Sequence, residues 1–173
     1  MSEAAAPARA IAYIGLGANL GDLAGTLRAA LAALAALPES HLAAVSGAWR
    51  SAPVDAGGPD FLNAVARLET ALAPLALLDA LQAIELSHGR ERPYRNAPRT
   101  LDLDLLLHGD AVLQTPRLTL PHPRLHERAF VLRPLLELAP GLVLPGLGAL
   151  AGRLPEVAQQ RIERLDLELS PGC

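Results

Sequence analysis

The sequence has 173 residues, of which 51% are hydrophobic and 19% charged, with a formal net charge of −3. This length and apolar content suit one folded domain with a real core, and they exclude a largely disordered chain. The small negative charge argues against a nucleic-acid or anionic-membrane surface, and because all fifteen basic residues are Arg, a P-loop or Schiff-base lysine is excluded.

The sequence carries no signal for export or membrane insertion. Its one cysteine, Cys173, leaves no intramolecular disulfide and no thiol metal site. The longest uncharged stretch that could be helical, residues 29–37, is too short to cross a bilayer. Residues 1–10 lack a basic region followed by an apolar run. We therefore expect a cytoplasmic protein with a disordered lead over residues 1–10 and a single domain over residues 11–173.

Strands and helices alternate in the first two thirds of the chain. Residues 11–16 are apolar and end in glycines, which is typical of a strand, and Gly15, Gly17 and Gly21 then indicate a tight loop that Asn19 would hold. The Ala- and Leu-rich run that follows is typical of a helix. The predicted elements are a strand at 11–16, a helix at 24–37, strands at 42–51 and 61–70, a helix at 74–88 and a strand at 100–108.

This order of elements is that of the ferredoxin-like βαββαβ fold, which belongs to the α+β class. We expect a sheet covered by helices, followed by a C-terminal extension. In this extension we expect a short strand near Val112, a Pro-rich loop at 116–124, a helix around 130–138 and a final strand near 162–169.

Asp102 and Asp104 are the first candidate functional residues. They lie two apart on a predicted strand, so both carboxylates point to one face while the leucines between them point to the other. Such a pair suits Mg²⁺, which takes one or two carboxylates together with phosphate oxygens and water. An ordinary strand with a polar outer face gives the same alternation, and the spacing alone slightly favours that interpretation.

The preceding loop changes this balance. Arg90, Arg92, Arg95 and Arg99 lie within ten residues and are opposed only by Glu91. Guanidinium groups bind phosphate oxygens through paired donors, and a cationic loop beside an acidic strand is what a metal–polyphosphate complex requires. The two features together therefore favour metal–phosphate chemistry.

Histidines of the Pro-rich loop give a weaker hypothesis. His122 and His126 have the spacing of a helical zinc pair, but Pro121 and Pro123 argue against a helix there. We expect His122 to donate to a phosphate or to brace the loop.

The only two phenylalanines, Phe61 and Phe130, have two possible roles. Burial in the core is the usual fate of Phe and is favoured by sequence physics alone. The alternative is that the two rings sandwich a flat heterocycle.

Six motifs in order resemble the 6-hydroxymethyl-7,8-dihydropterin pyrophosphokinase family, over roughly residues 11 to 145. The run PRTLDLDL at 98–105 is the most specific of them. The others are YIGLGANL at 13–20, FLNAV at 61–65, GRER at 89–92, LTLPH at 118–122 and RAFVLRPL at 128–135.

The resemblance implies a role for each site residue. Asp102 and Asp104 would hold two Mg²⁺ ions, and Arg90 and Arg99 would stabilise the pyrophosphoryl group in transit. The ATP site would be lined by Gln82, Glu85, Arg90, Arg92, Arg99, Arg117, Thr119, His122 and Arg128. The pterin site would be lined by Phe61, Asn63, Phe130, Pro53 and Val54, with the two rings stacked on the pterin, which reverses the packing expectation for them.

The implied reaction is attack by the pterin hydroxyl on the β-phosphorus of ATP with release of AMP, in folate biosynthesis. The partners would be these two small molecules, with no nucleic acid and no membrane, and the chain would act as a monomer. The alternatives are another Mg²⁺-dependent phosphoryl or nucleotidyl transferase, and a non-catalytic ATP-sensing module.

The Arg-rich loop departs from the family pattern. It is about one residue shorter than is usual in the family, with Pro93 at a position that is often basic and Asn96 at one that is often aromatic. We expect Pro93 to restrict closure of this loop over the substrates.

Overall fold

The structure is a computed structural model that describes residues 9–19, 22–52, 60–88, 101–144 and 146–169. The elements of the predicted core are β1 (Ala10–Ala18), α1 (Leu23–Ala35), β2 (Ser40–Val45), β3 (Ala48–Ser51), β4 (Phe61–Thr70), α2 (Pro74–Ser87) and β5 (Asp102–His108). The C-terminal extension contains β6 (Leu113–Gln114), β7 (Thr119–Leu120), α3 (Ala129–Leu138), β8 (Val143–Leu144), β9 (Gly148–Ala149), the 3-10 helix η1 (Leu150–Val157) and β10 (Ile162–Leu165).

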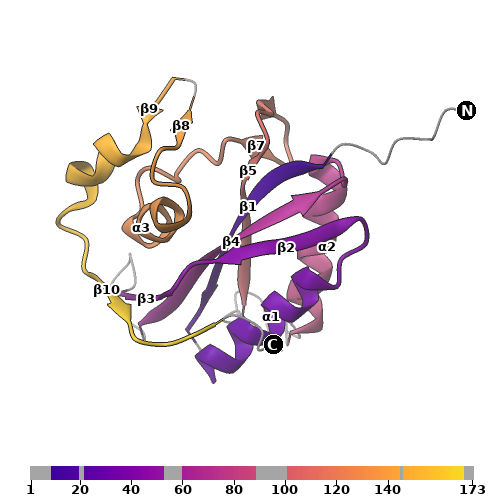
Figure 1. The fold of residues 1–173 in the computed structure, drawn as a ribbon, viewed down its shortest axis with the longest axis horizontal. Helices are drawn as coiled ribbons and strands as arrows, with labels where there is room; N and C mark the ends of the chain where they lie inside the picture. Colours follow the sequence, from indigo (N-terminus) through magenta and orange to yellow (C-terminus); the bar gives the residue numbers. More distant parts are fainter. Residues whose placement is uncertain (1–8, 20–21, 53–59, 89–100, 145, 170–173) are drawn as a thin grey trace, which may run out of the picture.

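The main sheet has six strands in the order β10-β3-β4-β1-β5, with β2 also paired to β4 (Figure 1). All of its pairings are antiparallel. This is the strand order of a ferredoxin-like sheet, with β10 of the extension added at one edge. The α+β class and the βαββαβ order predicted from the sequence are therefore confirmed.

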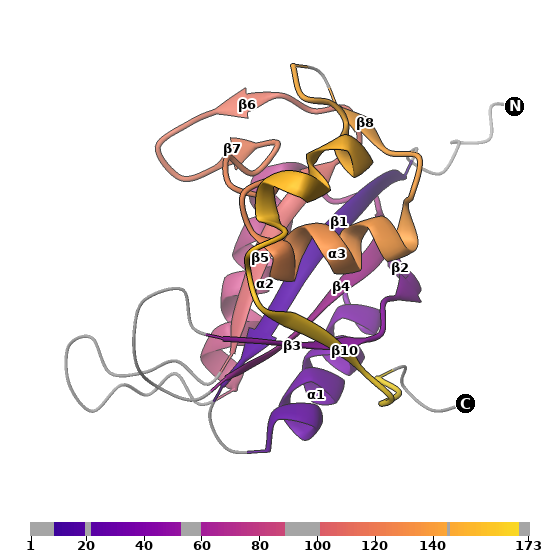
Figure 2. The same cartoon turned by 90° about the vertical axis from the view of Figure 1, so that its left-hand side faces the viewer.

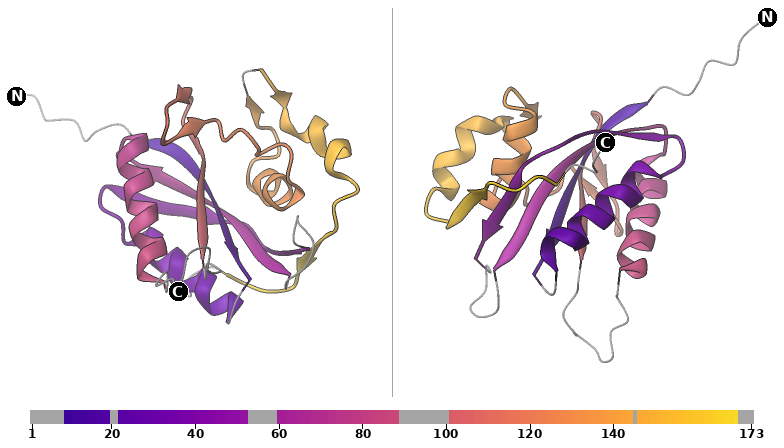
Figure 3. Two further views of the ribbon diagram at one scale, coloured as in Figure 1. Left: turned by 180° about the vertical axis from the view of Figure 1, so that it is seen from behind. Right: turned by 60° about the horizontal axis from the view of Figure 1, so that its bottom comes forward.

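Helices cover both faces of the sheet, as Figures 2 and 3 show. One face packs on α1 and α2 around buried residues such as Ile14, Leu31 and Leu81. The opposite face packs on α3 and η1 around Val65, Leu132 and others. No helix among the described residues combines the length and the apolar character needed to cross a bilayer.

The helix boundaries have local causes. The Asp22 side chain caps α1 by accepting a hydrogen bond from the Gly25 amide at 3.0 Å, and the role expected for Asn19 in this turn stays a prediction. In α2, Pro74 occupies the first turn, where its missing N–H costs nothing.

Three predicted elements differ from the structure. The strand predicted at 11–16 continues to Ala18, so Gly15 and Gly17 lie inside β1 and not in a loop. The strand predicted at 42–51 is interrupted at Ser46 and Gly47, because the Gly47 amide bonds to the Glu137 side chain at 2.8 Å and leaves the ladder. The last strand ends at Leu165, four residues earlier than predicted.

Candidate active site

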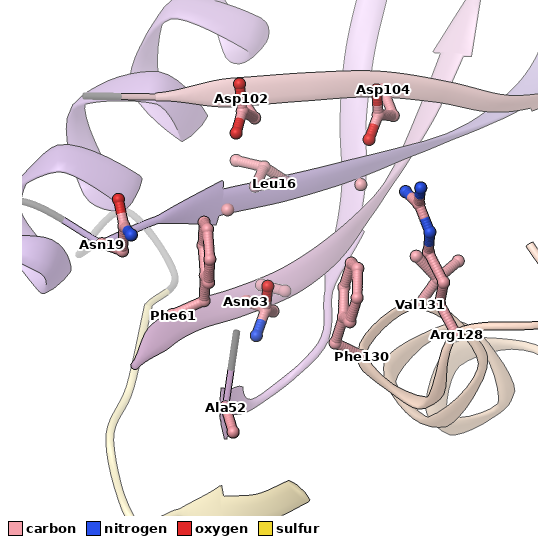
Figure 4. A pocket seen from close by; sticks show the side chains of 13 residues that line it. Leu16, Asn19, Ala52, Phe61, Asn63, Asp102, Asp104, Arg128, Phe130 and Val131 are labelled. Carbon is pink, nitrogen blue, oxygen red and sulfur yellow. The ribbon is translucent and has the colours of Figure 1, made fainter. Parts of the chain in front are cut away.

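A cavity of about 520 Å³ opens on the α3 face of the sheet, beside the N-terminal end of that helix (Figure 4). Its volume lies within the range of small-molecule sites. Strands β1, β4 and β5 form its floor, and the N-terminal end of α3 forms one wall. Every described lining residue comes from these elements or from the ends of the segments next to them.

Strand alternation explains why polar residues gather on this floor. Gly17 is paired with Asn63 on one side and with Asp102 on the other, and Gly15 is paired with Asp104. Paired residues of neighbouring strands point to the same face, so the two carboxylates and the amide share that face. A Cβ at Gly17 would lie 3.3 Å from Asn63 Oδ1 and would project into this space. The two glycines thus leave the floor open.

Both carboxylates of the predicted metal pair point into the cavity (Figure 4). Leu101, Leu103 and Leu105 are buried on the other side of the strand, as the alternation predicts. Carboxylate oxygens on a strand fixed in this way are the donors that Mg²⁺ prefers. The described residues contain no cluster of three or more His, Cys, Asp or Glu side chains, so a cation here would need ligands from a bound phosphate or from water.

Glu85 supports this strand from the side. It is 6% exposed on α2, and its carboxylate accepts a hydrogen bond from the Leu103 amide at 2.8 Å. Leu103 lies between Asp102 and Asp104 on β5, which is an edge strand of the sheet. The carboxylate therefore satisfies a backbone donor on the side of β5 where the described residues form no further strand.

Phe61 and Phe130 stand on either side of Asn63 and border the part of the cavity that we call the aromatic slot (Figure 4). Neither ring is fully buried, and both line the cavity. The expectation of simple core packing is therefore wrong for them, although Phe130 also packs partly against the core on its own face of the sheet. Two rings facing a gap of this kind can stack on a flat molecule.

Asn63 is held firmly at the base of the aromatic slot. It is 3% exposed, and its Nδ2 donates to Ser51 Oγ at 2.7 Å and to the Trp49 carbonyl at 3.2 Å. Since these bonds fix which side of the amide is Nδ2, the Oδ1 atom is directed toward the Gly17 side of the floor.

Arg128 brings positive charge to the wall of the cavity that α3 forms. It is the N-cap residue of α3, and its guanidinium carbon lies 5.6 Å from the centre of the Phe130 ring. That distance allows a cation–π interaction. In Figure 4 the guanidinium points toward the strand that carries Asp104.

His122 is close enough to these charges to be influenced by them. Burial lowers the pKa of His122, and this outweighs the attraction of Asp104, while Arg128 and Arg124 lower it further. The imidazole is therefore neutral at neutral pH. Because its Nδ1 accepts a bond from the Arg124 amide at 3.1 Å, its proton lies on Nε2, which is left as a donor.

The remaining predicted ATP residues lie outside the lining of this cavity. Arg117 donates to Gln82 Oε1 at 3.3 Å and forms an ion pair with Asp79 at 2.5 Å, which joins α2 to the turn before β7. Thr119 lies in β7. The structure thus groups Gln82 with Arg117, as one site would require.

Several predicted site residues lie outside the described residues: Arg90, Arg92, Arg99, Pro53 and Val54, as do Pro93 and Asn96 of the shortened loop. Conversely, sequence reasoning missed the cavity positions of Gly15, Gly17, Asn19 and Ala52. Alternating glycines in the first strand were a usable signal, since a strand that carries glycine on one face leaves room for a ligand.

Comparison with known proteins places these features in a family. The family model described as 7,8-dihydro-6-hydroxymethylpterin-pyrophosphokinase matches residues 13–140. A Pseudomonas aeruginosa protein named 2-amino-4-hydroxy-6-hydroxymethyldihydropteridine pyrophosphokinase is 51% identical over 154 residues, covering 88% of this chain and 95% of that protein. A Haemophilus influenzae protein of the same name is 44% identical over 156 residues, covering 90% and 98%.

Solved structures share the fold at low sequence identity. A crystal structure of HPPK-DHPS in complex with substrates has a TM-score of 0.68 at 12% identity over 86% of this chain. The wild-type Plasmodium falciparum HPPK-DHPS with pteroate has a TM-score of 0.69, also at 12% identity. This chain spans 43% and 44% of those two solved chains, respectively.

Proposed function

This chain belongs to the 7,8-dihydro-6-hydroxymethylpterin-pyrophosphokinase family, and from that membership we infer that it transfers pyrophosphate from ATP to 6-hydroxymethyl-7,8-dihydropterin in folate biosynthesis. The observation that carries this inference is the cavity itself. It combines a pair of carboxylates, an arginine and two facing aromatic rings around an asparagine. A metal–polyphosphate and a flat heterocycle would meet in such a cavity.

The aromatic slot suits the pterin. Its rings would stack on Phe61 and Phe130, and the amide of Asn63 would read the polar edge of the heterocycle. The bonds from Asn63 to Ser51 and Trp49 support this role, because an amide held in one orientation discriminates between donors and acceptors on a ligand.

Asp102 and Asp104 suit the nucleotide. Their carboxylate oxygens fit Mg²⁺, and we propose that together they hold two ions with the phosphates of ATP. When bound, Mg²⁺ neutralises charge on the phosphate oxygens. Arg128 would add positive charge from α3, and the neutral His122 would offer its Nε2 proton to an oxygen acceptor.

The chemical step is attack by the pterin hydroxyl oxygen on the β-phosphorus of ATP. The bond from that phosphorus to the oxygen of the α-phosphate breaks, AMP leaves, and the hydroxyl proton passes to solvent or to a phosphate oxygen. Positioning and charge stabilisation supply most of the rate in such transfers. Arg90 and Arg99 would stabilise the pyrophosphoryl group in transit, which remains a prediction for residues outside the described part of the chain.

We propose that the acting unit is a monomer. Light scattering during size-exclusion chromatography of the purified protein tests this proposal, and a dimer mass would contradict it.

Product analysis tests the proposed reaction. The purified protein is incubated with Mg-ATP and 6-hydroxymethyl-7,8-dihydropterin, and the nucleotide products are separated by chromatography. We expect AMP and a pterin diphosphate in equal amounts. ADP in place of AMP would identify a simple phosphoryl transferase, and ATP binding without any turnover would identify a non-catalytic module.

A further inference from the structure

Glu137, near the C-terminal end of α3, has more hydrogen-bond donors around its carboxylate than any ordinary surface ion pair requires. Its Oε1 accepts from the Trp49 indole at 3.0 Å and from Arg164 Nε at 3.2 Å. Its Oε2 accepts from the Gly47 amide at 2.8 Å and from Arg164 Nη2 at 3.0 Å. Both oxygens are thus doubly engaged, and we call this group of four residues the Glu137 clamp.

The clamp joins three elements that are distant in the sequence. Glu137 belongs to α3, Gly47 and Trp49 lie at and just after the break between β2 and β3, and Arg164 lies on β10. The packing around the break is tight, since a Cβ on Gly47 would lie 2.5 Å from the Arg164 guanidinium. The carboxylate therefore fixes where α3 lies relative to β3.

One wall and the base of the aromatic slot depend on those two elements. Phe130 is seven residues before Glu137, so it lies on the same face of α3, about 10 Å along the helix axis. On the other side, Trp49 is paired with Asn63 of β4, and its carbonyl accepts a bond from Asn63 Nδ2. A shift of α3 against β3 would therefore move Phe130 relative to Asn63.

We propose that Glu137 is a positioning residue for the pterin, because the clamp sets the distance between Phe130 and the floor that carries Asn63 and Phe61. This inference rests on the proposed function, since it takes the pterin as occupant of the aromatic slot. Glu137 does not line the cavity, so it acts through Phe130 and Asn63 and not by contact with the substrate.

A purely stabilising ion pair predicts something different. Exposed pairs contribute little to stability, and the loss of a pair with no positioning role would leave the pterin KM unchanged. Here the Gly47 amide and the Trp49 indole also lose their acceptor when the carboxylate is removed, so the junction between α3 and β3 has to rearrange. The consequence should fall mainly on pterin affinity and less on ATP affinity, although Arg128, at the N-terminal end of α3, would move with the helix.

The decisive experiment compares Glu137→Ala with the wild-type protein in steady-state assays of AMP release. We expect the KM for the pterin to rise about tenfold or more, since small misplacements of binding groups are costly. The KM for ATP should rise by a clearly smaller factor, because Arg128 is one of several residues assigned to ATP. Glu137→Gln keeps one oxygen acceptor of two, so its pterin KM should lie between those of the wild type and Glu137→Ala.

A spectroscopic signal and a matched control complete the test. Trp49 is the only tryptophan of the chain, so its fluorescence emission should change in both Glu137 variants. Glu156→Ala serves as the control, because Glu156 forms an exposed ion pair with Arg153 within η1 and has no part in the clamp. Its pterin KM and its Trp49 emission should equal those of the wild type.

Each outcome bears on the proposal. An unchanged pterin KM in Glu137→Ala, or an equal loss of ATP and pterin affinity, would overturn it. If circular dichroism shows that Glu137→Ala does not fold, the same comparison is made with Glu137→Gln and Arg164→Ala. If the wild-type protein releases no AMP, the proposed function fails, while calorimetric titration of the pterin into wild type and variants still tests the clamp.

Discussion

At the scale of single residues, the cavity depends on the missing side chains of two glycines as much as on the carboxylates of two aspartates. Asp102 and Asp104 point to a face on which their partners in β1 are Gly17 and Gly15. Larger residues at the glycine positions would project into the space above the floor. The alternation that places the carboxylates is readable in the sequence, whereas the pairing with glycine is a consequence of sheet order.

Replacing Asp104 by Asn tests the carboxylate pair. The change keeps the size of the side chain but removes the charge that would hold the metal–nucleotide complex. We expect kcat to fall on the order of 100-fold or more, because charge stabilisation is a large term in such reactions. Steady-state assays of AMP release measure this.

The matched control is Asp110→Asn, in the turn that follows the same strand and away from the cavity lining. It should retain wild-type turnover. Near-normal turnover in Asp104→Asn, with the fold intact by circular dichroism, would count against the metal assignment.

At the scale of elements, the edge strand β5 needs support that the sheet cannot give. Within the described part of the chain its outer side has no neighbouring strand, and the Leu103 amide bonds instead to Glu85 on α2. The same strand carries both carboxylates, so this hydrogen bond from β5 to α2 helps to fix the strand from which they project. The resemblance assigns Glu85 to the ATP site, and its burial indicates that it also has this structural role.

Removing the Glu85 carboxylate should therefore weaken both the fold and the site. In Glu85→Ala the Leu103 amide is left without this acceptor, which costs about 1–3 kcal/mol of unfolding free energy. Urea denaturation followed by circular dichroism measures the loss. Glu69→Ala, on β4 in the same sheet, is the control and should change stability by less than about 0.5 kcal/mol. Equal stability of Glu85→Ala and the wild type would contradict this role.

At the scale of the whole molecule, α1 and α2 cover one face of the sheet, and α3 and η1 cover the other face except over the cavity. Glu137 is one of the polar ties across that second layer. Partial burial by itself raises the pKa of Glu137, but the hydrogen bonds from Arg164, Gly47 and Trp49, together with the charge of Arg164, lower it below its ordinary range.

This shift predicts a pH dependence of stability. Since the pKa of Glu137 is lower in the folded chain than in the unfolded one, its contribution is complete above the unfolded pKa and is lost as the pH falls through the folded value. We expect the unfolding free energy of the wild type to fall more steeply below about pH 4 than that of Glu137→Gln. Urea titrations at several pH values measure both, and parallel curves would show that the carboxylate contributes nothing.

The sequence by itself determined the α+β class, the order of the core elements and the carboxylate pair on one strand face. These features follow from local periodicity, which depends only on neighbouring residues. The motifs further pointed to the family and to Phe61, Asn63 and Phe130 as one site, while the ion count and the roles of Arg90 and Arg99 remain predictions.

Only the tertiary structure decided which residues meet across the sheet. The interruption at Gly47 could not be read locally, because the acceptor that draws its amide out of the ladder is Glu137, 90 residues away in the sequence. For the same reason the sequence placed Gly15 and Gly17 in a turn, where the structure has them in β1 opposite Asp104 and Asp102. Long-range hydrogen bonding and strand pairing determine the conformation at these glycines, and they outweigh the preference of glycine for turns.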